Sequence, residues 1–117
     1  METLTIYHNP RCSKSRQALA LLQERKIPLR VVEYLKEPPT RAELAGLRRK
    51  LGLSPAQWIR KNEAEFKEAR LDSDAPEDTL LDAMAKHPIL IERPIVVRGD
   101  RAVVGRPPER VLELLGK

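Results

Sequence analysis

Thr3–Ser15 reads TLTIYHNPRCSKS, and this stretch around the only cysteine of the chain decides the fold. Residues 3–7 are β-branched, aromatic or alternately apolar, which predicts a half-buried strand. A turn follows at Asn9-Pro10, and the apolar residues of 18–22 have the spacing of a helix face. We therefore expect a helix that begins at Cys12 or the next residue, with the cysteine at its N-terminus.

Cys12 is a candidate reactive thiol because of this position. The unpaired N–H groups and the positive dipole end of a helix N-terminus favour a thiolate. Arg11, Lys14 and Arg16 add positive charge, and His8 is a further candidate cation. A lone cysteine is more commonly a small buried side chain. The cations and the absence of apolar neighbours nevertheless favour a reactive thiol with a lowered pKa.

Ser15 lies one helical turn beyond Cys12 and completes a Cys-x-x-Ser arrangement. Its hydroxyl is placed to donate a hydrogen bond to the sulfur. Serine cannot form a disulfide, so redox chemistry at Cys12 would need a second sulfur from another molecule, such as glutathione or a partner protein.

The remaining sheet elements lie on both sides of a long central segment. Residues 27–35 predict a second strand, which should be parallel to the first because a helix connects the two. Residues 95–98 and 101–104 predict an antiparallel hairpin, with Gly99 at the first position of a type II′ turn. A closing helix should follow, whose apolar stripe consists of Val111, Leu112 and Leu115.

The central segment, about residues 38–87, predicts a helical insertion. A capping box at Thr40–Glu43 precedes a helix over 41–51. A second serine-capped pattern predicts a short helix over 54–60, and a further helix should begin within 74–77. The charged residues of this segment are interpreted as a solvated face.

This order of elements resembles a thioredoxin-like layout. We expect an α/β fold with a mixed four-stranded sheet, a helical insertion between the second and third strands, and the reactive cysteine at the start of the first helix. A chain of 117 residues can bury a core without disulfides. We therefore expect residues 1–117 to form a single domain.

Composition excludes several functional classes. One cysteine and two histidines supply no ligand set at metal spacing, so we expect no metal site. The formal net charge of +5 favours anionic ligands, whereas an aromatic content of 3% argues against a nucleic-acid stacking platform. We expect a cytoplasmic protein with no membrane contact, because no apolar run is long enough to span a bilayer and no signal peptide precedes the first strand.

Three arginines are candidate anion ligands: Arg60, Arg93 and Arg106. Two of them immediately precede prolines, which bias the preceding residue toward extended backbone and hold it at an element boundary. Any one of them alone would be interpreted as a surface arginine.

Several separate motifs, in the same order, resemble the glutaredoxin-coupled arsenate reductase family. The resemblance covers residues 3 to about 115, and its motifs are His8-Asn9-Pro10 with Cys12 and Ser15, Tyr34-Leu35 followed by Pro38-Pro39, Arg60-Lys61-Asn62, His87-Pro88-Ile89-Leu90-Ile91, Arg93-Pro94-Ile95-Val96-Val97, and Arg106-Pro107.

The resemblance implies a function and a role for each candidate residue. Cys12 would be the nucleophile, His8 and Ser15 would tune its thiol, and Arg60, Arg93 and Arg106 would together hold the oxyanion. The resemblance also implies a cis peptide bond before Pro94. The implied activity is reduction of arsenate to arsenite through a sulfur–arsenic adduct, with glutathione as co-substrate, glutaredoxin as partner and no bound cofactor.

Two other functions fit parts of the same pattern. A regulator resembling the Spx family would bind RNA polymerase, but such regulators often carry Cys-x-x-Cys, and Ser15 stands here at the second position. A general glutathione-dependent thiol oxidoreductase would act on protein mixed disulfides, and it would need no cluster of arginines.

Overall fold

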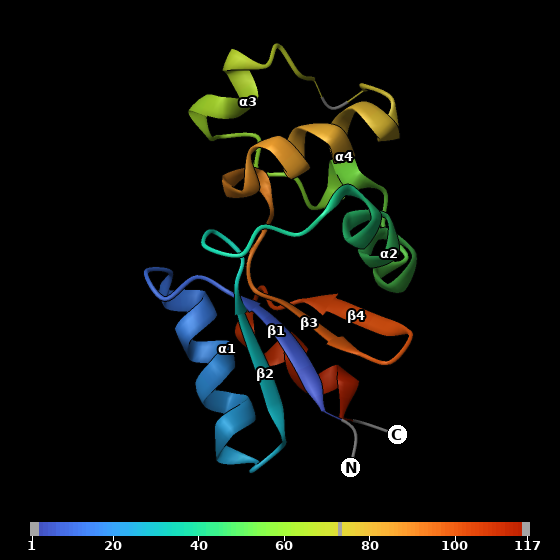
Figure 1. The fold of residues 1–117 in the computed structure, drawn as a ribbon. Helices are drawn as coiled ribbons and strands as arrows, with labels where there is room; N and C mark the ends of the chain where they lie inside the picture. The colour runs from blue at the N-terminus through green and yellow to red at the C-terminus, as the bar shows by residue number, and fades with distance from the viewer. Residues whose placement is uncertain (1–2, 73, 116–117) are drawn as a thin grey trace. The chain divides into compact units, whose positions relative to one another are not determined.

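The computed structural model describes residues 3–72 and 74–115. The chain divides into two compact units (Figure 1). The sheet unit is formed by the residues up to Glu37 together with those from Arg93 onward, and the helical unit is Pro38–Glu92. The helical unit therefore enters the chain between the second and third strands, as predicted.

Within residues 3–37 and 93–115, the sheet unit contains four strands and two helical segments: β1 (Leu4–His8), α1 (Ser13–Glu24), β2 (Leu29–Glu33), β3 (Ile95–Arg98), β4 (Arg101–Val104) and the 3₁₀ helix η3 (Pro108–Leu114). The strand order is β2-β1-β3-β4. β1 is parallel to β2 and antiparallel to β3, and β3 and β4 form the antiparallel hairpin. The predicted mixed four-stranded sheet and thioredoxin-like fold are confirmed.

The core of the sheet unit determines which face of β1 its last residue occupies. Burial along β1 alternates, so that Leu4, Ile6 and His8 lie on its inner face. The apolar core combines this face with side chains of α1, β3 and η3: Leu4, Ile6, Ala18, Leu22, Val96, Val111 and Leu114. A slip of one residue would turn this inner face toward solvent. The register therefore places His8, the last residue of β1, on the side of the sheet that α1 covers.

The β3–β4 hairpin turns at Gly99, as predicted. Arg98 pairs with Arg101, and Gly99 has a φ of 57°. Lys26 and Arg70 are the only non-glycine residues with positive φ in the part of the chain that the structure describes, so Asp100 has a negative φ. A positive φ at the first turn position alone is the type II′ geometry.

The expected closing helix is a 3₁₀ helix, and its buried stripe differs from the prediction. The predicted stripe of Val111, Leu112 and Leu115 assumed α-helical spacing. A 3₁₀ helix repeats every three residues. The buried side chains of η3 follow that period: Pro108, Val111 and Leu114. Leu112 and Leu115 are only partly buried against the same core.

In its described residues, 38–72 and 74–92, the helical unit contains three α-helices and two 3₁₀ helices: α2 (Arg41–Leu51), η1 (Pro55–Gln57), α3 (Ala64–Glu68), α4 (Glu77–Lys86) and η2 (Pro88–Leu90). Both hydrogen bonds of the predicted capping box at Thr40 and Glu43 are present. Gly52 ends α2 in the left-handed conformation, with a φ of 67°. The bounds of α2 are those predicted, because both ends are specified by local chemistry.

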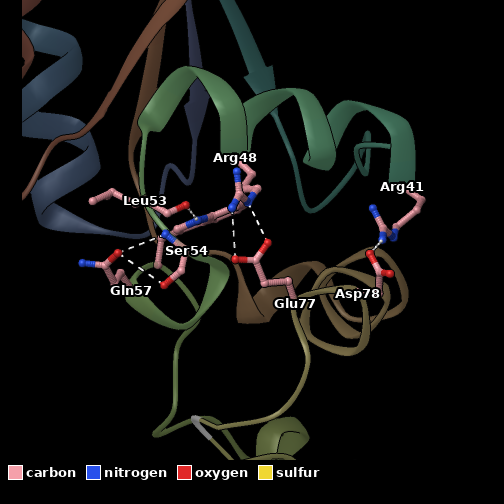
Figure 2. Close-up of polar contacts among 8 residues, drawn as sticks. Arg41, Arg48, Leu53, Ser54, Gln57, Glu77 and Asp78 are labelled. Carbon is pink, nitrogen blue, oxygen red and sulfur yellow. Dashed lines mark hydrogen bonds and ion pairs between the residues drawn. The ribbon is translucent and has the colours of Figure 1, made fainter.

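Ion pairs join α2 to α4 on the surface of the helical unit (Figure 2). Arg41 binds Asp78 with an N–O distance of 2.7 Å, and Arg48 binds Glu77 at 2.8 Å. Exposed pairs of this kind contribute roughly 0–1 kcal/mol each. The two helices are held mainly by their buried side chains, which are Leu44 and Leu47 of α2 and Leu80, Leu81, Ala83 and Met84 of α4.

Two predictions for the helical unit need correction. The helix expected over 54–60 is limited to η1, because Ile59 leaves it to form an antiparallel bridge with Ile91. The sequence interpretation also missed α3, which buries Phe66.

Across residues 3–72 and 74–115, we find no helix with the length and apolarity needed to cross a membrane.

Candidate active site

Cys12 occupies the N-cap position of α1, as predicted. Its backbone is extended, with φ −94° and ψ 121°, and α1 begins at the next residue. The loop before it is closed by Asn9, whose carbonyl accepts a hydrogen bond from the Cys12 N–H at 3.0 Å. The Asn9 side chain accepts from the Arg11 N–H, also at 3.0 Å. This Asx turn holds the cysteine partly exposed at the end of β1.

The environment of Cys12 lowers the pKa of its thiol. Burial acts in the opposite direction and raises the pKa, but the Ser15 N–H donates a hydrogen bond to the sulfur and lowers it. The Arg93 guanidinium lowers it further by a hydrogen bond and by its charge, and the Lys14 N–H adds a smaller effect. The predicted lowering is confirmed. The cationic side chain that lowers the pKa of the thiol is Arg93, which is remote from Cys12 in the chain. The sequence interpretation assigned this effect to cations in the loop beside Cys12.

His8 and Ser15 form a buried pair behind the loop. Nδ1 of His8 lies 2.6 Å from Oγ of Ser15, and the same oxygen accepts a hydrogen bond from the Asn9 N–H at 3.0 Å. Ser15 is fully buried, and His8 and Asn9 are 6% and 7% exposed. The hydroxyl therefore fixes the loop, and the contact of Ser15 with the sulfur is made by its backbone N–H.

His8 is not the cation that the sequence suggested. Burial lowers the pKa of its imidazole, the carboxylate of Glu33 partly opposes this, and Arg16 lowers the pKa further. A neutral imidazole can accept a hydrogen bond at Nδ1 from the Ser15 hydroxyl. The role that the geometry gives His8 is to orient Ser15 and the loop.

Arg93 and Arg106 are brought together by two loops of the sheet unit. Nη1 of Arg106 donates a hydrogen bond to the Arg93 carbonyl at 3.1 Å. The peptide bonds Arg93-Pro94 and Arg106-Pro107 are both cis. The cis bond expected before Pro94 is confirmed, and the second one was not predicted.

Gly105 allows these two loops to approach each other. Its N–H donates to the Pro94 carbonyl at 2.8 Å. A Cβ atom at position 105 would lie 2.8 Å from Cγ of Pro94 and 2.9 Å from Cγ1 of Val111. Only glycine fits this gap without displacement of a neighbour. The sequence interpretation missed Gly105, although a glycine directly before Arg106-Pro107 was the available signal.

Arg60 belongs to the helical unit, where two carboxylates hold its guanidinium. Nε lies 3.0 Å from Glu63 and Nη1 lies 2.8 Å from Glu92. The side chain of Arg60 is only 21% exposed. Burial lowers its pKa, but the hydrogen bonds and charges of both glutamates outweigh this and raise it. Neither glutamate was identified from the sequence.

Within residues 3–72 and 74–115, we find no group of three or more histidine, cysteine, aspartate or glutamate side chains that could hold a metal ion.

Comparisons with known proteins show what this chain is similar to. Residues 7–114 match the model of the ArsC family. An arsenate reductase of Neisseria meningitidis serogroup A is 48% identical over 117 residues, which cover 98% of this chain and all of that protein. An uncharacterized protein of Escherichia coli K12 is 49% identical over 95% of each chain. The solved structure of an arsenate reductase from Vibrio cholerae has a TM-score of 0.91 and 49% identity, and the match covers 96% of this chain and 97% of that one.

Proposed function

The chain belongs to the ArsC family, and from that premise we propose that it reduces arsenate to arsenite through the Cys12 thiolate. Glutathione and glutaredoxin supply the electrons. The observation that supports the proposal is that the Arg93 guanidinium is close enough to the Cys12 sulfur to lower the pKa of the thiol by a hydrogen bond and by its charge.

Arginine suits the substrate as well as the thiolate. Arsenate is a tetrahedral oxyanion, and a guanidinium fork can bind two of its oxygens at once. Repulsion between the thiolate and the incoming anion opposes the reaction. Two unit charges about 4 Å apart interact by roughly 4 kcal/mol at an effective dielectric constant near 20, so each converging cation can offset one such repulsion. Arg93 and Arg106, which lie together in the sheet unit, are assigned this role. The same role for Arg60, which is paired with two glutamates in the helical unit, stays a prediction.

The proposed reaction balances two electrons. The Cys12 thiolate attacks arsenic(V), and one oxygen leaves as water after protonation. Glutathione then adds to arsenic with loss of a second water. The glutaredoxin thiolate attacks the glutathione sulfur, so that these two sulfurs leave as a mixed disulfide and arsenic is reduced to arsenic(III). Water finally displaces arsenite from Cys12 and regenerates the thiol.

The remaining site residues act as positioning groups. His8 and Asn9 hold Ser15 through its hydroxyl, and Ser15 presents its N–H to the sulfur. None of these side chains needs to exchange a proton with the substrate in the proposed mechanism.

A cytoplasmic location, which the electron donors would require, stays a prediction.

The test is arsenate-dependent NADPH oxidation coupled through glutathione reductase and glutaredoxin, with arsenite measured directly. Wild-type protein should form arsenite only when both glutathione and glutaredoxin are present. Cys12→Ser should form no arsenite. Arsenite formation by this variant at the wild-type rate would overturn the proposal.

One observation also fits a second function. A partly exposed thiol with a lowered pKa is what a general glutathione-dependent thiol oxidoreductase needs. That enzyme would reduce protein mixed disulfides with the same efficiency in wild type and in Arg106→Gln. An arsenate reductase would lose arsenate turnover in this variant, so the two assays run side by side separate the functions.

A further inference from the structure

A cavity opens where the two parallel strands of the sheet unit end. Its volume is about 220 Å³, and its lining consists of His8, Asn9, Pro10, Arg11, Glu33, Leu35 and Lys36. His8 and Glu33 are paired across β1 and β2. The chain turns away after each of these residues and leaves a space beyond the carboxyl ends of the strands, which is where open α/β sheets bind ligands.

The lining carries charges of both signs around an apolar patch. Glu33 supplies a carboxylate, Arg11 and Lys36 supply cations, and Leu35 adds an apolar side chain that is 42% exposed. Nζ of Lys36 lies 3.4 Å from Glu33, and the two side chains are 79% and 38% exposed. A pair this exposed contributes little to stability, so a ligand bearing both charges can replace it.

We propose that this cavity binds the α-amino-acid head of the thiol co-substrate, that is, the γ-glutamyl end of glutathione. Glu33 accepts hydrogen bonds from the ligand's α-ammonium group, and Arg11 and Lys36 bind its α-carboxylate. This inference rests on the proposed use of glutathione, and it adds the site at which the protein recognises that molecule.

The size and place of the cavity support this ligand. Its volume is below the roughly 300–1,000 Å³ of typical drug-sized ligand sites, so it can admit an amino-acid head and leave the rest of the tripeptide outside. Arg11 immediately precedes Cys12, and adjacent Cα atoms are about 3.8 Å apart. A ligand anchored at Arg11 can therefore extend its own thiol toward the reacting sulfur.

The charges also distinguish this ligand from simpler ones. A free oxyanion would bind the two cations but leave the Glu33 carboxylate without a partner in the ligand, and an uncharged apolar thiol would leave all three charged side chains without one. A zwitterion matches both signs at once. Electrostatic matching of this kind contributes mainly to specificity.

The binding test needs neither arsenate nor turnover. S-methylglutathione, which has no free thiol, is titrated into isotope-labelled protein, and backbone amide shifts are followed by NMR. The proposal expects the shifts to concentrate in the loop that carries Arg11 and in the turn from Glu33 to Lys36. Shifts centred elsewhere, or none at millimolar ligand, would overturn it.

A charge-removal variant tests the role of Glu33. Glu33→Gln should weaken binding of S-methylglutathione about tenfold, the effect of losing one charged hydrogen bond. The matched control is Glu37→Gln, because Glu37 is exposed in the same turn but does not line the cavity. An equal loss in both variants would overturn the assignment.

A ligand analogue separates direct contact from an effect through His8, whose pKa Glu33 also influences. The analogue lacks the α-ammonium group and keeps the rest of S-methylglutathione. Wild type should bind it about tenfold more weakly than the parent ligand, and Glu33→Gln should bind both alike. If the analogue and the parent bind equally well to wild type, the proposal fails. Absence of arsenite formation would instead contradict the proposed function and leave these binding results standing.

Discussion

Gly105→Ala tests whether the loops that carry Arg93 and Arg106 are packed too closely to admit a side chain at position 105. The added Cβ would lie 2.8 Å from Cγ of Pro94 and 2.9 Å from Cγ1 of Val111. Both distances are shorter than van der Waals contact, and a proline ring cannot rotate away. Overpacking of a tight site costs about 1–3 kcal/mol, so we expect the free energy of unfolding to fall by that amount.

The measurement is urea denaturation of Gly105→Ala beside Gly46→Ala as a matched control. Gly46 lies within α2, where a Cβ would meet only the Arg49 side chain at 3.7 Å. Alanine is favoured over glycine inside a helix by about 0.5–1 kcal/mol, so this control should be more stable than the wild type. The reasoning is refuted if Gly105→Ala unfolds at the same urea concentration as the wild type or at a higher one.

Three further predictions concern charge and backbone conformation. Arg93→Lys keeps the charge but loses the fork, so kcat/KM for arsenate should fall about 10- to 100-fold in the coupled assay, and an unchanged value would argue against bidentate binding. Because burial lowers the pKa of His8, the folded state binds fewer protons at this residue than the unfolded state does. The contribution of His8 to the free energy of unfolding is therefore fully present above the unfolded pKa of 6.5, and it is lost as pH falls through the folded pKa. The urea midpoint should fall less steeply with decreasing pH in His8→Gln than in the wild type. Parallel midpoint profiles of the two proteins would exclude His8 as the source of this pH dependence. Lys26 has a φ of 56° just after α1, and Lys26→Gly should raise the free energy of unfolding by about 0.5–1 kcal/mol; thermal denaturation at a lower temperature than the wild type would contradict this.

Local chemistry explains why much of the fold was predictable. The N-terminus of α1 at Cys12, the capping box at Thr40 and the turn at Gly99 each depend on residues within a few positions of one another. The parallel pairing of β1 and β2 follows from the helix between them. These elements need no knowledge of the rest of the chain.

The parts that local sequence patterns could not predict depend on contacts between remote residues. Arg93 and Cys12 meet only because β3 lies beside β1, and no local pattern assigns the thiol's cation to Arg93. The need for glycine at position 105 appears only when the ring of Pro94 is in place. Likewise, η3 takes a three-residue period because its buried face must fit the core, which overrides the α-helical spacing of its leucines.

The candidate site shows the same division. Cys12 was identified from its predicted position and from the cations beside it, whereas the roles assigned to its neighbours changed once the tertiary contacts were known. His8 was expected to add positive charge, but burial favours its neutral form and gives it a positioning role. The identity of one histidine does not predict its burial, and the available signal was the alternation of Leu4 and Ile6 along β1, which continues to His8.

The central claim is that hydrogen bonds from the Ser15 N–H and from Arg93 lower the pKa of the Cys12 thiol despite its burial, and alkylation of the thiol tests it most directly. Because the chain has one cysteine, the rate of iodoacetamide reaction against pH reports the Cys12 pKa without interference. The account predicts an apparent pKa below the usual value for cysteine in wild type, and a higher pKa in Arg93→Met. A wild-type pKa at or above the usual value, or an equal pKa in the two proteins, would contradict it.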